Sequence, residues 1–322
     1  SDRPIYNYFM DLSYEIADKS ILITPARFLF NAGKTPKAWN RKMLADEHLK
    51  VVYYEQDSSQ VFPNTDIKGG IVITYHDCKK YFGAIEVFTA HEELNQILKK
   101  VVMKPDFESL SKIIYSSDSY RMTEKMHKDF PTAKGRLSNG HEFDVTTNIF
   151  EKLPDVFINN NDGQVGDFVR IIGRENNDRV YKWVDRRYIN GPLNLKNYKV
   201  ILPKSNGSGI LGEVLSSPII GAPLTGHTQT FLSIGSFDAK SEAKACIKYI
   251  KTKFTRTLLG ILKITQHNPA EKWNYVPLQN FSDNSDIDWS KSTSEIDQQL
   301  YKKYGLSNEE ITFIEDKVKD ME

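Results

Sequence analysis

The chain has 322 residues, enough for two domains, and its 39% hydrophobic and 26% charged residues are ordinary for a soluble globular protein. No apolar run approaches the ~20 residues of a membrane span and no secretory signal is recognisable, so we expect no membrane partner. Cys78 and Cys246 lack zinc-ligand spacing and are expected to be free thiols in a reducing, cytoplasmic compartment.

The net charge of +1 is unevenly distributed along the chain. Residues 168–204 hold nine Lys/Arg against three acids, and residues 240–263 hold seven against one. Residues 282–322 hold eleven acids against five bases. This distribution indicates a middle region that binds a polyanion and a solvated acidic end, although ordinary solvated helix faces explain the charges equally well.

Strand and helix patterns alternate over the first hundred residues. Helices are predicted over residues 5–17, with Ile5, Phe9, Leu12 and Ile16 on one face, over 36–44 and over 91–102, and strands over 21–23, 49–55, 71–75 and 84–88. The alternation predicts an α/β sheet, but three or four strands are few for a doubly wound domain. We therefore expect residues 1–104 to form an incomplete Rossmann-like sheet.

After residue 104 the chain is rich in Gly, Asn, Ser and Pro. Short strands are predicted over residues 169–172, 180–184, 198–202 and 230–234, and one long helix over 241–265. Capping boxes, Ser292 with Glu295 and Ser307 with Glu310, predict two final helices separated at Gly305. We expect residues 105–322 to form a mixed α+β domain that ends in a helical hairpin.

Several catalytic motifs are incomplete. Gly33-Lys34-Thr35 resembles the end of a phosphate loop, but position 28 holds Phe28 in place of the required glycine. Asp238, Glu242 and Lys244 have the residue types of a nuclease metal triad, but a helix start makes the last two diverge. The sequence therefore favours neither a phosphate-binding loop nor a nuclease metal triad.

The stretch over residues 61–75 places a Phe-Pro turn and two glycines before an apolar strand. A Phe at the mouth of a strand is suited to stack on a flat ligand, most commonly a nucleobase. Phe62 is the candidate, and the alternative is a core Phe beneath a loop.

A basic set in the middle of the chain has the residue types that contact DNA. Arg reaches phosphates and guanine edges, and Asn reads adenine. The candidates are Arg170, Arg174, Arg179, Lys182, Arg186, Arg187, Lys204 and Asn206. Surface charge without a ligand is the alternative.

These segments resemble a known family. Residues 4–9 (PIYNYF), 22–29 (LITPARFL) and 61–71 (VFPNTDIKGGI) look like the later motifs of γ-type adenine-N6 DNA methyltransferases of restriction–modification systems. Residues 247–278, in which a long helix precedes an apolar-Pro-apolar strand, resemble more loosely the target-recognition domains of these enzymes and of type I specificity subunits.

The resemblance implies a site and partners. Phe62 would stack on the extruded adenine, Pro25 would lie in the active-site wall, and double-stranded DNA would be the partner. The family's Asn/Asp-Pro-Pro-aromatic tetrapeptide and its glycine-containing loop for S-adenosylmethionine are both absent. We therefore expect the C-terminal piece of a larger methyltransferase, with the cofactor bound by a missing N-terminal half and none by this chain, and with a nuclease or helicase part as a further partner.

Three other functions remain open at this point. The chain fits a non-catalytic DNA specificity subunit that recruits a methylase or nuclease. It also fits one half of a restriction nuclease, or a module that binds RNA or nucleotides. Metal-dependent nicking would support the nuclease, and a preference for single strands would support the RNA-binding module.

Overall fold

A three-stranded sheet organises the N-terminal lobe of the computed structural model, which describes residues 3–160 and 166–321. β1 (Lys19–Pro25) and β2 (Leu49–Glu55) flank β3 (Ile71–Asp77), which runs antiparallel to both. Residues 84–88, predicted as a strand, form none. They pass over the lobe as coil, where the Phe88 ring packs edge-on against Phe30 and Tyr54.

Helices cover one face of this sheet. α1 (Tyr6–Ile16), the short helix η1 (Ala26–Phe30) and α2 (Lys37–Ala45) enclose a core with Leu49 and Val72. The helix expected over residues 5–17 is confirmed, but its apolar face is not buried: Ile5, Phe9, Leu12 and Ile16 are exposed. α1 turns Met10, Tyr6 and Tyr14 to the core instead. The Tyr6 ring packs against Phe28 and Trp39, and the Tyr14 ring stacks on His76.

The other face of the sheet is open, and among the described residues neither outer strand, β1 or β2, pairs with a further strand. Ile21 and Ile23 of β1 are 68% and 52% exposed, and Tyr53 of β2 is 45% exposed. In the strand register, Ile73 of β3 lies between Ile23 of β1 and Tyr53 of β2. These three side chains therefore share one face of the sheet. Among the described residues, β1 pairs only with β3, which leaves its outer edge free.

A helical body forms the centre of the molecule. It contains α3 (Glu92–Val102), α6 (Lys240–Lys251), α7 (Lys253–Leu262), α8 (Thr293–Tyr304) and α9 (Asn308–Lys317). The two predicted final helices form, with both capping boxes made and Gly305 left-handed between them. A division by packing falls before α3, not after residue 104, because Leu94, Ile97, Leu98 and Val101 join the core of the central body.

The long helix predicted over residues 241–265 is interrupted. Thr252 has an extended ψ of 148° between α6 and α7, and its hydroxyl accepts the backbone N–H of Thr255. Asp297 of α8 accepts the N–H groups of the two residues between them, Lys253 and Phe254. Residues 274–278 do not form the strand that the resemblance predicted; the short helix η7 (Ala270–Trp273) is followed by coil with one bridge at Pro277.

Two sheets connect the central body to a distal body. The four predicted strands are confirmed as β6 (Phe168–Glu175), β7 (Asp178–Asp185), β9 (Tyr198–Pro203) and β12 (Phe231–Phe237). One sheet has the order β10-β9-β12-β4, with β10 (Ile219–Gly221) and β4 (Ile114–Tyr115), and packs on α6. The other, β11-β6-β7 with β11 (Thr225–His227), covers the distal core.

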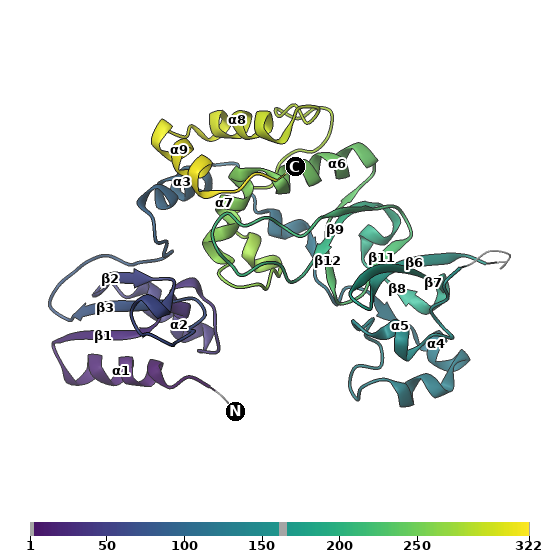
Figure 1. The fold of residues 1–322 in the computed structure, drawn as a ribbon, viewed down its shortest axis with the longest axis horizontal. Helices are drawn as coiled ribbons and strands as arrows, with labels where there is room; N and C mark the ends of the chain where they lie inside the picture. The colour runs from purple at the N-terminus through teal and green to yellow at the C-terminus, as the bar shows by residue number, and fades with distance from the viewer. Residues whose placement is uncertain (1–2, 161–165, 322) are drawn as a thin grey trace.

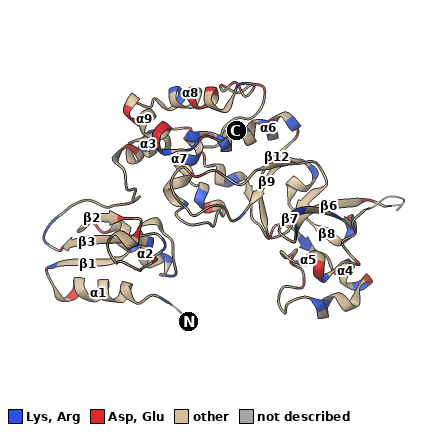
Figure 2. Cartoon of the chain, viewed as in Figure 1, with Lys and Arg blue, Asp and Glu red and all other residues tan. Residues whose placement is uncertain are grey.

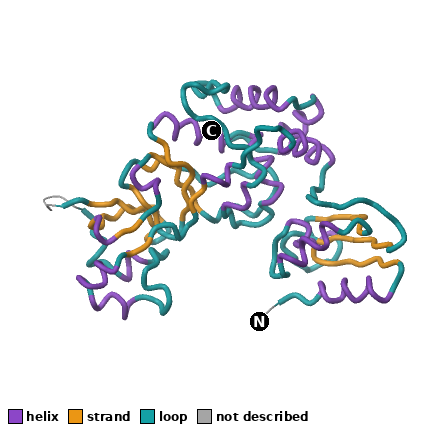
Figure 3. The backbone as a smooth tube through the Cα atoms, turned by 180° about the vertical axis from the view of Figure 1, so that it is seen from behind, coloured by secondary structure: helices purple, strands orange, loops and turns teal. Residues whose placement is uncertain are grey.

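The distal body is completed by short elements. They are β5 (Arg121–Met122) paired with β8 (Ile189–Asn190), α4 (Glu124–Asp129), α5 (Ile149–Lys152) and the turn η5 (Arg186–Tyr188). The molecule is an arch in both views, with the N-terminal lobe and the distal body at its ends and α6–α9 across its crown (Figures 1 and 3).

Charges of both signs lie on the crown, including α8 and α9 (Figure 2). Over residues 3–160 and 166–321, no helix is long and apolar enough to cross a membrane. Within the same residues, no three His, Cys, Asp or Glu side chains are grouped to hold a metal ion. Both Cys78 and Cys246 are free, as predicted.

Candidate nucleic-acid interface

Pro25 and the Phe62 turn lie at the same end of the N-terminal sheet. Pro25 ends β1 and pairs with Ile71 at the start of β3, where Glu55 ends β2. The backbone N–H of Ala26 donates to the carbonyl of Gly70 at 2.9 Å. The two residues that the family resemblance singled out therefore come from separate segments that meet at the carboxyl ends of β1 and β2.

Hydrogen bonds hold the Phe62 turn in shape. The Ser58 hydroxyl accepts the N–H of Ile67 at 2.8 Å and donates to the carbonyl of Thr65 at 3.1 Å. Gly70, at φ 78°, has no room for a side chain because a Cβ would lie 2.2 Å from the Glu55 carbonyl oxygen. Phe62 is 43% exposed at the turn, which excludes the alternative of a core Phe.

A second candidate surface lies on the β6–β7 hairpin. Register places Arg170 opposite Trp183 and Arg174 opposite Arg179, so these side chains and that of Tyr181 occupy one face. The Arg170 guanidinium lies 4.5 Å from the Tyr181 ring centroid and 5.9 Å from that of Trp183. We call Arg170, Arg174, Arg179, Tyr181 and Trp183 the arginine–aromatic face.

Burial affects Arg179 within this face. Its guanidinium lies over the Phe231 ring and donates to the carbonyl of Ser217 at 2.7 Å. Partial burial, and then the positive charge of Arg174, lower the pKa of Arg179. Arg174 is exposed and Arg170 half-buried, so the face combines fixed and accessible cations.

The sequence analysis missed Tyr181 and Trp183 as members of this face. Their alternation with Arg179 at every second position is a recognisable signal, since such residues point to one side of a strand. Lys182 falls between them and points to the opposite side. There it pairs with Glu175 at 3.0 Å and donates to the Asn159 side chain, so it is not part of the arginine–aromatic face.

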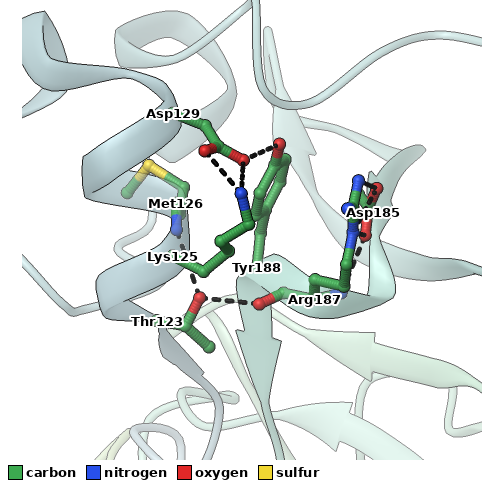
Figure 4. Close-up of polar contacts among 7 residues, drawn as sticks. All are labelled: Thr123, Lys125, Met126, Asp129, Asp185, Arg187 and Tyr188. Atoms are coloured by element: carbon green, nitrogen blue, oxygen red, sulfur yellow. Dashed lines mark hydrogen bonds and ion pairs between the residues drawn. The ribbon is translucent and has the colours of Figure 1, made fainter.

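Arg186 and Arg187 form hydrogen bonds that stabilise the turn between β7 and β8. The Arg187 side chain bonds the Asp185 carboxylate, and its carbonyl accepts the Thr123 hydroxyl at 2.7 Å (Figure 4). Hydrogen bonding to Arg187 lowers the pKa of Asp185. Arg186 donates to the carbonyl of Ile189 at 2.7 Å. Arg187 keeps an exposed side chain, whereas Arg186 is half-buried.

Lys204 and Asn206 lie on the loop after β9 and are not members of the arginine–aromatic face. Asn206 is buried, donates to the carbonyl of Val214 at 2.9 Å and accepts hydrogen bonds from Ser216. Its amide is therefore occupied within the fold. Lys204 is half-buried, and its backbone bonds Thr230 and Asn268.

The N-terminal lobe matches a protein family. Residues 1–62 match the model of the Eco57I restriction-modification methylase, and the match ends at the Phe62 turn. It covers about a fifth of the chain. It supports a DNA methyltransferase of a restriction–modification system as the class of protein to which this lobe is related. A comparison with curated proteins finds no match.

Proposed function

We propose that the chain supplies the base-binding wall and the target-recognition part of a γ-type adenine-N6 DNA methyltransferase in a restriction–modification system. The observation that carries this proposal is the family match over residues 1–62 together with the meeting of Pro25 and the Phe62 turn at one sheet end. The parent reaction would transfer a methyl group from S-adenosylmethionine to adenine N6. N6 of a stacked and paired adenine is inaccessible, so the base must leave the duplex.

Phe62 is suited to hold such a base. Its ring is accessible, and the hydrogen-bonded turn limits its backbone freedom. Stacking of a base on an aromatic side chain is worth about 1–3 kcal/mol. Pro25 would contribute a rigid wall at the neighbouring strand end.

The open sheet supports completion by another part of the methyltransferase. The free edge of β1 offers backbone groups for a further strand, and Ile21 and Ile23 offer an apolar face for covering helices. We propose that the cofactor-binding part of the domain docks there and extends the incomplete Rossmann-like sheet.

The residues present do not fit S-adenosylmethionine. β1, β2 and β3 are followed directly by Ala26, Gln56 and Cys78, and the glycine-containing loop that the family uses for S-adenosylmethionine is absent from the sequence. The donor would therefore be bound by the part that docks on β1, and this chain alone should not methylate DNA.

The arginine–aromatic face supports DNA recognition by the remainder of the chain. Arginines contact phosphates and guanine edges, and the rings of Tyr181 and Trp183 orient Arg170. In this proposal the distal body is the reader of the duplex, and the cytoplasm is where the reaction takes place.

Two measurements test the proposal. The 322-residue chain should bind duplex DNA with an affinity that falls steeply with salt, because phosphate contacts release counterions. Methyl transfer to adenine should require a second polypeptide carrying the Asn-Pro-Pro-aromatic strand. Binding that does not change between low and moderate salt, or methylation by this chain alone, would contradict it.

A non-catalytic specificity subunit is the second candidate, because the chain carries the arginine–aromatic face and lacks the family's S-adenosylmethionine loop. Completion of the β1 edge distinguishes the two. The methyltransferase proposal expects a partner that protects the β1 backbone from hydrogen exchange, whereas a specificity subunit would leave it exposed while its partner binds elsewhere.

A further inference from the structure

A basic cleft lies between the N-terminal lobe and the central body. It has a volume of about 600 Å³ and is lined by Arg27, Lys37 and Lys68 from the lobe, by His267 from the segment before η7, and by Lys272 within η7. Glu271 is the acid on its wall. Lys68 belongs to the same turn as Phe62, so the cleft opens at the end of the sheet where we place the target base.

Arg27 is held in a fixed position in this cleft. Its Nε donates to the carbonyl of Lys68, which ties η1 to the Phe62 turn. The aliphatic part of the Arg27 side chain packs beside two glycines. A Cβ added to Gly69 would lie 2.8 Å from Arg27 Cγ, and a Cβ added to Gly33 would lie 3.2 Å from Arg27 Cβ. Both glycines have positive φ, so a side chain at either position would also strain the backbone.

The cations of the cleft are only partly neutralised by ion pairs. Among the described residues, no carboxylate forms an ion pair with Arg27, Lys37 or Lys272, whereas exposed Lys68 pairs with Asp66 at 2.8 Å. Lys37 and Lys272 come from different bodies, and burial followed by the charge of Lys37 lowers the pKa of Lys272. Like charges kept together at a partly buried site favour an anion between them.

We propose that this cleft binds one backbone phosphate of the DNA strand that carries the target adenine, with Lys37 and Lys272 gripping it from two sides and Arg27 as a positioning residue. The inference depends on the proposed function. Its consequence is mechanical: a phosphate held by both bodies fixes the Phe62 turn relative to the part of the chain that reads the sequence. None of the candidate DNA contacts identified from the sequence lies in this cleft.

The test compares the double variant Lys37→Gln/Lys272→Gln with the wild-type chain. Fluorescence anisotropy with a 30-base-pair duplex is measured between about 50 and 200 mM salt, the range over which phosphate contacts change affinity strongly. Loss of one phosphate contact should reduce the slope of log K against log salt by about 0.9 and weaken binding about tenfold at 0.1 M salt. The matched control is Lys240→Gln/Lys302→Gln, two exposed lysines on α6 and α8 outside the cleft.

The outcomes separate this inference from the function on which it depends. An unchanged slope in the cleft variant, with salt-dependent binding by the wild-type chain, overturns the inference and leaves the proposed function intact. Equal losses in the cleft and control variants also overturn it, because net charge alone would explain them. Absence of DNA binding by the wild-type chain overturns the proposed function. Unfolding temperatures of both double variants, measured first, exclude misfolding as the cause of a loss.

Discussion

Asp297 of α8 caps α7 by accepting the backbone N–H of Phe254 at 2.8 Å. Its other carboxylate oxygen accepts the N–H of Lys253 at 2.9 Å. Two donors left free at the start of a helix are thereby satisfied by a buried acid from another helix. This contact links α8 to the start of α7, at the break where the predicted long helix becomes two.

Replacement of Asp297 tests this cap. Asp297→Ala should cost about 1–2 kcal/mol of stability through loss of the N-terminal cap. Asp297→Asn keeps one acceptor without the charge and should lose less near neutral pH. Thermal unfolding followed by circular dichroism measures both, and an alanine variant as stable as the wild type would contradict the assignment.

The same variants have a defined pH dependence. Burial raises the pKa of Asp297 to about 7. A carboxyl whose folded pKa is raised contributes stability below its unfolded pKa and loses it as pH rises through the folded pKa. The stability of the wild type relative to Asp297→Asn should therefore fall between about pH 4 and pH 7. A stability advantage of the wild type over Asp297→Asn that grows over this pH range would contradict the raised pKa of the buried Asp297.

Lys199 gives the opposite dependence. It is fully buried, donates to the carbonyl of Thr225 at 2.8 Å, and burial lowers its pKa to about 7. Between pH 7 and the ordinary lysine pKa, the unfolded chain binds more protons, so stability should rise with pH. Lys199→Met should flatten this rise, as shown by urea unfolding at pH 7 and pH 9. The exposed Lys302→Met variant should retain the wild-type slope.

The two faces of the β6–β7 hairpin provide a matched pair for DNA binding, with Arg170 of β6 on one face and Lys182 of β7 on the other. Arg170→Ala should weaken binding and reduce the salt slope by about 1 if the guanidinium contacts a phosphate, or relax sequence preference if it contacts a base. Lys182→Gln removes a cation on the opposite side and should leave DNA binding unchanged. Equal effects of the two changes in anisotropy titrations would show that the arginine–aromatic face has no special role.

Phe62 is testable in the assembled methyltransferase. Phe62→Ala should lower kcat/KM about 5- to 150-fold, the equivalent of the ~1–3 kcal/mol of base stacking. Phe62→Trp should retain much of the activity because it keeps a flat ring. Since Phe62 is 43% exposed, its replacement should change the unfolding temperature little. Equal activity of the alanine and tryptophan variants would exclude stacking.

Prediction from the sequence succeeded where the signal is local. Ser292 and Glu295 form their capping box, Gly305 ends α8, and the strands from Phe168 and Asp178 form as expected. Prediction failed where contacts with a distant segment determine the local structure or the burial of a side chain. The apolar stripe of α1 is exposed because aromatic side chains on its other side meet Phe28 and Trp39, and residues 84–88 form no strand.

The candidate site shows the same division. The Phe-Pro turn and the basic residues were recognisable as residue types, but their partners were not. Lys182 and Arg170 are both cationic, so the sequence does not distinguish them. The alternation of side chains along the paired strands puts them on opposite faces of the hairpin, where Lys182 pairs with Glu175. The basic cleft was not predicted at all, since Lys37 and Lys272 are far apart in the chain.

The sequence by itself determined the local elements, the helix ends and the relation of residues 1–62 to restriction-modification methylases, because these depend on neighbouring side chains and short motifs. The tertiary structure decided three features: the exposure of Phe62, the packing of α3 against the central body, and the break between α6 and α7. These depend on which distant segments pack together. Asp297 reaches Lys253 across 44 residues of chain, and no local pattern records such a contact.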